Sequence, residues 1–181
     1  MDKISDIKLL IGILLEKNLS YIREIQTILN IPKSTISDKL KELYKDNIID
    51  FEIKGRNKLF FFKNSFEAKQ YLRFIEIYKL EILIKNYPNL KSIINSIQEK
   101  IDNELVLIFG SYSKNQADSS SDIDIFIQTN SRKLKEEIKF INSKISVKIG
   151  DLNKKTNLNQ EIKKDGVVIH GIDEFLKIKN E

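Results

Sequence analysis

Two aspartates separated by a single residue are the first candidates for chemistry in this chain. They stand in the segment Asp122-Ile123-Asp124-Ile125, where polar and apolar residues alternate. This alternation predicts a β-strand, and because side chains alternate across a strand, both carboxylates are expected on one face. Carboxylates on residues about 6–7 Å apart at Cα can converge on a hard cation such as Mg²⁺, which takes oxygen ligands. The pair therefore predicts a magnesium site.

A glycine and a serine before this pair supply a second kind of chemistry. The apolar run Leu105 to Phe109 has the length and composition of a buried strand, and it stops at Gly110-Ser111. Glycine lets the backbone approach a ligand closely, and a helix starting there would offer free N–H groups to a phosphate. A phosphate site beside paired carboxylates suits metal-assisted phosphoryl or nucleotidyl transfer. The alternative is a surface loop with a Ser/Asp cap and an ordinary strand.

The segment from about Glu104 to Gly171 resembles the polymerase-β-like nucleotidyltransferases, especially the small prokaryotic minimal members. Their signature is Gly-Ser, about ten residues, and then Asp-x-Asp in a strand, which here is Gly110-Ser111, residues 112 to 121, and Asp122-Ile123-Asp124. The resemblance implies an Mg²⁺-dependent transfer of a nucleotide, AMP from ATP or another NTP, onto a hydroxyl.

The same resemblance implies roles for single residues. Asp122 and Asp124 are the implied metal ligands and catalytic residues, and Gly110 and Ser111 are implied to hold the phosphates of the nucleotide. Lys114 is either a further phosphate ligand or a solvent-facing lysine. Some minimal members act as antitoxins, so a partner protein of the toxin kind is also implied.

One position departs from the family pattern. Active members place a third carboxylate on the strand expected here over residues 144–149, whose corresponding face carries Ser146 and Lys148. Asp151 lies just past that strand and substitutes only if the strand ends in a bulge or its register shifts. Without a third carboxylate, base assistance, typically worth about 10²–10⁴ in rate, is weakened. The alternative function is a DNA-binding transcriptional regulator whose second domain senses a nucleotide or dimerises.

Residues 1–63 contain three predicted helices followed by two predicted strands. The expected elements are a helix over 4–15, a helix capped by Ser20 that carries Ile22 to Leu29, a helix over 33–45, and strands over 48–53 and 59–62. Between residues 54 and 63 the chain has four cationic residues and no acidic one. This order resembles the winged-helix transcription factors, which implies double-stranded DNA as a partner.

The DNA contacts are expected on the third helix and on the loop between the strands. Small hydroxyl side chains and lysines at a helix start suit base edges and phosphates in a major groove. An arginine in the loop suits a phosphate or the minor groove. The residues concerned are Lys33, Ser34, Thr35, Ser37, Lys39, Arg56 and Lys58. Binding of paired half-sites would make the protein a homodimer; the alternative is a domain for protein contacts with a solvated charged face.

The whole chain is expected to fold as α/β of the α+β type. The predicted domains are a winged helix over residues 1–63, a helical connector over 64–103, and a nucleotidyltransferase-like domain over 104–181 with a mixed sheet and helices on one face. The connector is predicted as helices over 65–86 and 90–101, separated by Tyr87-Pro88. The single histidine, His170, is expected to be structural.

The bulk composition is that of a soluble protein with a modest positive charge. Of 181 residues, 41% are apolar and 31% charged, and the net charge of +5 permits a nucleic-acid partner without requiring one. No apolar run approaches the roughly 20 residues of a membrane span, so no membrane partner is expected. The chain has no cysteine, which excludes disulfides and thiolate metal sites and suits a reducing cytoplasm.

Overall fold

The computed structural model describes residues 3–179. The chain forms two compact units, Met1–Ile75 and Glu76–Glu181, and the boundary falls within the long helix α4 (Phe66–Asn86). Each unit has its own hydrophobic core. The division into domains 1–63, 64–103 and 104–181 stays a prediction. Among residues 3–179, no helix is long and apolar enough to cross a membrane.

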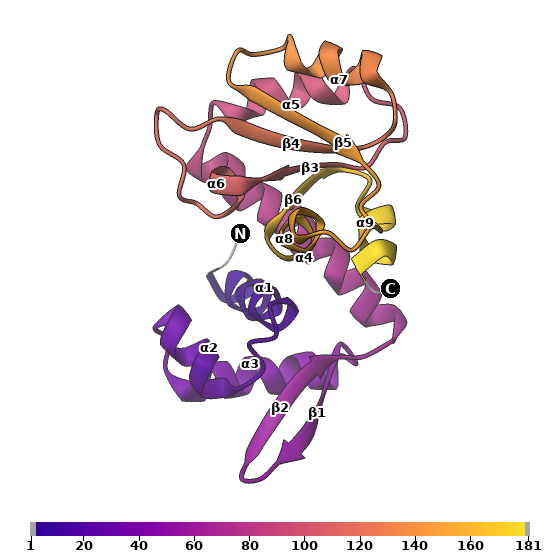
Figure 1. Ribbon diagram of the computed structural model, residues 1–181. Coiled ribbons are helices and arrows are strands. Elements are labelled where there is room, and N and C mark those ends of the chain that lie inside the picture. Colours follow the sequence, from indigo (N-terminus) through magenta and orange to yellow (C-terminus); the bar gives the residue numbers. More distant parts are fainter. Residues whose placement is uncertain (1–2, 180–181) are drawn as a thin grey trace. The chain divides into compact units, whose positions relative to one another are not determined.

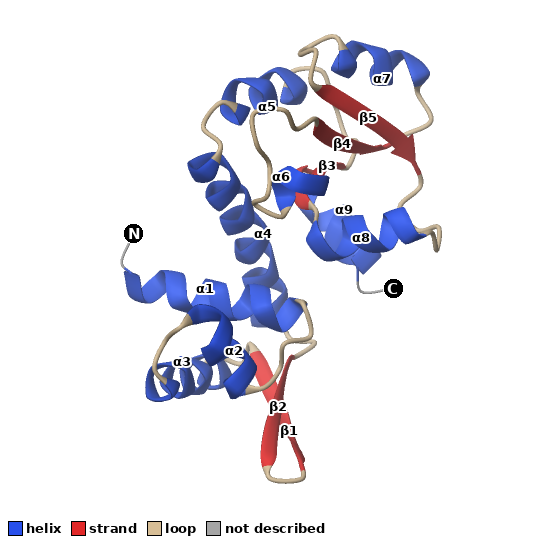
Figure 2. Cartoon of the chain, turned by 60° about the vertical axis from the view of Figure 1, so that its left-hand side comes forward, coloured by secondary structure: helices blue, strands red, loops and turns tan. Residues whose placement is uncertain are grey.

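Unit 1 consists of three helices followed by a β-hairpin (Figures 1 and 2). The elements are α1 (Lys3–Glu16), α2 (Ile22–Leu29), α3 (Lys33–Lys45), β1 (Ile49–Lys54) and β2 (Asn57–Phe62). The strands are antiparallel, and Lys54 pairs with Asn57, so only two residues turn the chain. The first of them, Gly55, has φ +61°, a conformation that tight hairpin turns require and that glycine adopts without strain.

The cap of α2 differs from the expectation. Tyr21, not Ser20, is the N-cap residue, and its backbone N–H donates to the Glu24 carboxylate at 3.1 Å. The carbonyl of Ser20 instead accepts a hydrogen bond from the N–H of Phe60 at 3.0 Å. This bond ties strand β2 to the segment before α2. The Ser20 prediction was wrong because α2 begins at Ile22, which makes Tyr21 the N-cap residue, with the N3 carboxylate of Glu24 accepting its N–H.

Apolar side chains from all five elements hold unit 1 together. Helix α3 has the predicted bounds, and Asn47 after it has a left-handed φ of +60°, as residues that follow a helix often do. The buried core residues are Ile11, Leu14, Leu15, Ile25, Ile36, Leu40, Leu43, Ile48, Ile49 and Phe60. This packing fixes α3 and the hairpin relative to α2.

Unit 2 is built on a four-stranded mixed sheet. Its strands are β3 (Val106–Phe109), β4 (Ile123–Gln128), β5 (Ile145–Gly150) and β6 (Val167–His170), in the order β5-β4-β3-β6. Strand β3 is antiparallel to both β4 and β6, whereas β4 and β5 are parallel. A mixed sheet with helices agrees with the predicted α+β class.

Helices cover both faces of this sheet, so the expectation of helices on one face was wrong. Helices α5 (Leu90–Gln98) and α7 (Arg132–Lys139) pack on one face, and α8 (Asn157–Asp165) and α9 (Ile172–Lys179) pack on the other (Figure 1). The reason lies in β3, whose four residues are all buried, Val106 and Ile108 in one core and Leu107 and Phe109 in the other. A strand that is apolar on both sides requires a cover on both sides.

Three smaller features refine the expectations. Helix α5 ends at Gln98, earlier than residue 101, and Phe66, the first residue of α4, is 73% exposed. His170 at the end of β6 places Nδ1 2.7 Å from the carbonyl oxygen of Glu104. This contact joins the last strand to the segment before β3, as a structural histidine would.

The start of α4 provides a stability test. The Ser65 hydroxyl oxygen accepts the N–H of Ala68 at 3.0 Å, and the same hydroxyl donates to the carbonyl of Asn47 at 2.6 Å. We expect Ser65→Ala to lower the free energy of unfolding by about 0.5–2 kcal/mol, as for other N-caps, measured by urea denaturation. Ser34→Ala, an exposed position in α3, is the control and should change it by less than about 0.5 kcal/mol. Equal effects of the two substitutions would contradict the capping role.

Candidate functional site

Strand β4 positions the two aspartates. Ile123, Ile125 and Ile127 point into the core beneath α5 and α7, so the alternation of side chains turns Asp124 toward the opposite face. Phe126, on that same face, packs with Ile162 of α8. Asp124 is half-buried, and Asp122, in the turn just before the strand, is exposed. The sheet thus presents Asp124 on the side that α8 covers, and Asp122 lies just before the strand.

Gly110 lies directly against Asp124. Phe109 pairs with Asp124 across the sheet, and the chain then turns at Gly110 into the four-residue helix α6 (Gly110–Ser113). A Cβ atom at position 110 would stand 2.5 Å from Oδ2 of Asp124, and the backbone there has φ +72°. Only glycine meets both conditions without displacing the carboxylate. The predicted helix start at Gly110-Ser111 is therefore present, with the half-buried Ser111 in its single turn.

Lys114 follows α6 and is ion-paired. Its Nζ donates to Oε1 of Glu161 in α8 at 2.5 Å, with 35% of the Lys114 side chain and 41% of the Glu161 side chain exposed. The hydrogen bond from Lys114 to Glu161 raises the pKa of the lysine. The sequence did not single out Glu161, because its proximity to Lys114 depends on how α8 packs beside α6.

The third-carboxylate position on β5 is occupied by other residues. The parallel register pairs Asp124 with Ser146 and Phe126 with Lys148 and runs to Gly150 without a shift. The condition under which Asp151 would substitute is therefore not met. Oδ1 of Asp151 instead accepts the N–H of Asn153 at 3.0 Å in the following turn.

The surroundings of Asp124 disfavour its ionised form and raise its pKa. Burial is the largest cause of its raised pKa, the hydrogen bond from Ser146 and the charge of Lys148 oppose the shift, and the charges of Asp122 and Glu161 add to it. Two carboxylates and nearby hydroxyls are oxygen donors of the kind Mg²⁺ prefers, and Mg²⁺ commonly takes one or two carboxylates with substrate phosphates. Among residues 3–179, no three acidic or histidine side chains are arranged to hold a metal ion. The residues thus fit a metal shared with a substrate.

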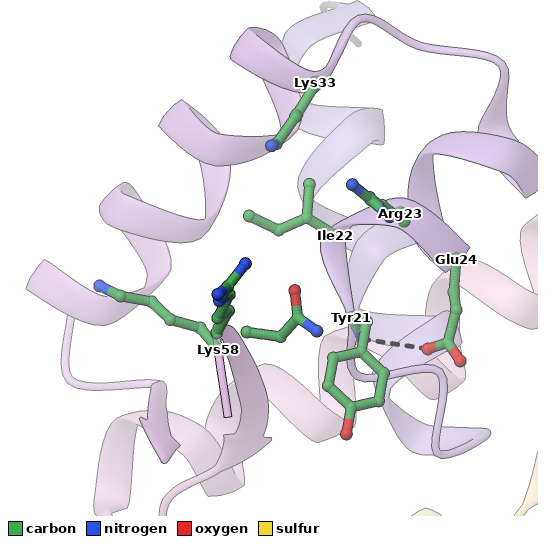
Figure 3. Close-up of a pocket in the computed structure, with 8 residues that line it drawn as sticks. Tyr21, Ile22, Arg23, Glu24, Lys33 and Lys58 are labelled. Atoms are coloured by element: carbon green, nitrogen blue, oxygen red, sulfur yellow. Dashed lines mark hydrogen bonds between the residues drawn. The ribbon is translucent and has the colours of Figure 1, made fainter. Parts of the chain in front are cut away.

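Unit 1 contains a separate cationic groove of about 570 Å³ (Figure 3). Its lining residues are Tyr21, Ile22, Arg23, Glu24, Lys33, Arg56, Asn57 and Lys58. Three of the predicted DNA-binding residues, Lys33, Arg56 and Lys58, thus lie around one hollow.

The other predicted DNA-binding residues lie along α3, outside the groove lining. Ser34 is exposed, while Thr35 and Ser37 are half-buried. Lys39 donates to Glu42 at 2.6 Å, with 14% of its side chain exposed. The fourth cation of the groove lining, Arg23, was not predicted as a DNA contact. Its place in the groove depends on the fold, which brings α2 beside the hairpin.

The raised pKa of Asp124 predicts a pH-dependent effect on stability. A carboxyl whose pKa is higher in the folded than in the unfolded state stabilises fully below its unfolded value of about 3.9, and this contribution is lost as pH rises through the folded value. We therefore expect Asp124→Asn to stabilise unit 2 more at about pH 7 than at about pH 3, measured by urea unfolding.

Asp118 gives a control of opposite sign. Hydrogen bonds from the hydroxyl and N–H of Ser120 lower its pKa, so its contribution is present above the unfolded pKa and is lost as pH falls. Asp118→Asn should therefore destabilise more at about pH 7 than at about pH 3. The same pH trend for both variants would contradict the assignment for Asp124.

The comparisons with known proteins bear on unit 2. Residues 91–175 match the family model described as polymerase beta, nucleotidyltransferase. The match contains all four strands of the sheet, the Gly110 turn and both aspartates. Searches of the curated proteins and of the solved structures found no match. The family match supports a nucleotidyltransferase domain over residues 91–175, within a mixed α/β unit of fitting architecture.

Proposed function

We propose that unit 2 transfers a nucleotide from ATP or another NTP to a hydroxyl group in an Mg²⁺-dependent reaction. The observation that carries the proposal is the contact of Gly110 with Asp124, within a segment that matches a nucleotidyltransferase family. This contact puts a carboxylate beside the turn that leads into α6. In the proposed site, the metal-binding carboxylate would then be adjacent to the phosphate-binding turn.

Each residue of the site has a defined part in this proposal. Asp122 and Asp124 hold the metal, which when bound neutralises phosphate charge and favours in-line attack. Ser111 would donate a hydrogen bond from its hydroxyl to a phosphate oxygen, and the glycine at position 110 lets the chain turn beside Asp124 without displacing its carboxylate. Lys114 offers its ammonium group to the phosphates, in exchange for its present partner Glu161.

Because strand β5 has no carboxylate beside Asp124, we expect the nucleotide-transfer reaction to be slow. Deprotonation of the attacking hydroxyl by a positioned base usually contributes about 10²–10⁴ in rate. The face of β5 that adjoins Asp124 offers Ser146, which is hydrogen-bonded to Asp124, and Lys148. Neither residue is a carboxylate that could take the proton of the attacking hydroxyl. Catalysis would then rest on the positioning of substrates and on electrostatic stabilisation.

The enzyme proposal is tested with labelled NTPs, Mg²⁺ and a cell extract that supplies acceptors. Loss of a metal ligand costs several kcal/mol of transition-state stabilisation, so Asp122→Asn and Asp124→Asn should each reduce labelling by about 10²-fold or more. Asp151→Asn, a carboxylate held in the turn after β5, is the matched control and should label as the unaltered chain does. Equal labelling by all three variants and the unaltered chain would refute the proposal.

A second function is favoured by the cations of unit 1: binding of double-stranded DNA. The order of three helices and a hairpin is that of a winged helix, and α3 begins with Lys33 and the exposed Ser34 at the side of the groove. Arg56 lies in the turn of the hairpin, where nothing covers Gly55, and Lys58 follows on β2 with its ammonium group over the Phe51 ring. Recognition of paired half-sites would involve a homodimer. A chain that binds DNA while its second unit only senses a nucleotide is the alternative to the enzyme.

DNA binding is tested by titrating a fluorescent duplex at several salt concentrations. Each phosphate contact contributes about 0.9 to the slope of log affinity against log salt, so Arg56→Gln with Lys58→Gln should weaken binding and lower the slope by about 2. Lys41→Gln with Lys45→Gln, an exposed pair on α3 outside the groove lining, removes the same charge as a control. An unchanged slope in the hairpin variant would contradict this role of the hairpin.

A further inference from the structure

A backbone hydrogen bond and the packing of buried side chains fix the shape of the cationic groove of unit 1. Its walls come from the start of α2, the start of α3 and the turn between β1 and β2. The bond from Phe60 N–H to the Ser20 carbonyl fixes β2 against the segment before α2, at 3.0 Å. Buried Ile25 and Ile36 fix α2 against α3. The groove is therefore part of the folded unit and needs no rearrangement to form.

The lining of the groove is strongly positive. It contains four cations and one acid, a net charge of +3. The acid, Glu24, already accepts the N–H of Tyr21 with Oε2. Lys58 lies with its ammonium group 3.7 Å from the centre of the Phe51 ring, which restrains its side chain. Arg23 faces the same hollow from α2 (Figure 3). Cations that converge from three elements predict an anionic ligand.

Solvent exposure decides which anion fits. Arg23, Lys33, Arg56 and Lys58 are all exposed, so a single small anion would keep much of its contact with water and be screened by salt. Small-molecule sites usually bury 70–90% or more of their ligand. A polymer with regularly spaced phosphates instead contacts several cations at once and releases counterions at each contact. The exposed lining thus favours a nucleic-acid backbone over a free nucleotide.

We propose that this groove holds the phosphodiester backbone of a double-stranded nucleic acid, with Arg23 as a backbone contact. The inference rests on the proposed binding of DNA and adds to it a contact from the start of α2. A guanidinium group suits this task because its fork of N–H donors matches two phosphate oxygens. Backbone contacts carry no sequence information, so the groove sets affinity and orientation while the exposed start of α3 reads bases.

The test compares Arg23→Gln with the unaltered full-length chain on two fluorescent duplexes of unrelated sequence. The substitution should weaken binding to both duplexes by the same factor and lower the salt slope by about 0.9, the value of one phosphate contact. Arg23→Lys keeps the charge and should retain most of the affinity. Lys69→Gln removes one exposed charge of unit 1 outside the groove and should leave the slope unchanged.

The possible results separate the inference from the function on which it rests. Unaltered affinity and slope in Arg23→Gln, with normal binding by the unaltered chain, would overturn the backbone contact from α2 and leave DNA binding by the start of α3 and the hairpin intact. No binding of either duplex by the unaltered chain would overturn both. ATP or a single strand that displaces the duplex at comparable phosphate concentration would also overturn the inference, in favour of a nucleotide or single-strand site. Circular dichroism of each variant confirms folding.

Discussion

The closeness of Asp124 to the backbone at residue 110 is the constraint on which unit 2 depends. The antiparallel register sets Phe109 opposite Asp124, so the next residue of the chain must pass over the carboxylate. A side-chain atom at position 110 would stand within 2.5 Å of Oδ2. The glycine thus fixes the route of the turn, and the turn fixes where α6, Ser111 and Lys114 follow. Strand β4, Gly110 and the Asp124 carboxylate together determine where the other residues of the site lie.

The same packing explains the electrostatic character of the site. Asp124 is half-buried because α8 covers its face of the sheet, and burial disfavours its ionised form. The protein compensates in part with the Ser146 hydroxyl and the Lys148 charge, both from β5. In the nucleotidyltransferases that this segment resembles, this neighbouring strand contributes an acid. A hydroxyl and a cation there lower the local negative charge, which suits the holding of one metal ion better than two.

Most of the secondary structure could be predicted from the sequence, because the signals are local. Pro32 before α3 and Asn47 after it mark its ends, and helix α3 has the predicted bounds. The Gly-Ser turn and the alternating strand with Asp122 and Asp124 are local in the same sense. Their spacing alone predicts that a turn and a carboxylate pair lie at one end of two strands, and the β3–β4 register agrees with it.

Features that depend on tertiary packing could not be predicted from the sequence. Helices α8 and α9 are short and rich in charge, so nothing in their sequence says that they cover the second face of the sheet. The contact of Glu161 with Lys114 joins residues 47 positions apart, and the groove joins three elements. The N-cap of α2 was misassigned because tyrosine is not a preferred N-cap residue, and only the backbone geometry shows that the helix starts one residue later than Ser20 would allow.

Under the proposed function, the Lys114–Glu161 ion pair would couple the binding of the nucleotide to the binding of the cation. A triphosphate that takes the ammonium group of Lys114 leaves the Glu161 carboxylate without its counter-ion, in a position where its charge already acts on Asp124. The extra negative charge would raise the affinity of the two aspartates for a divalent cation. Because such coupling is reciprocal, cation and nucleotide would each raise the affinity for the other, and the site would fill cooperatively rather than one ligand at a time.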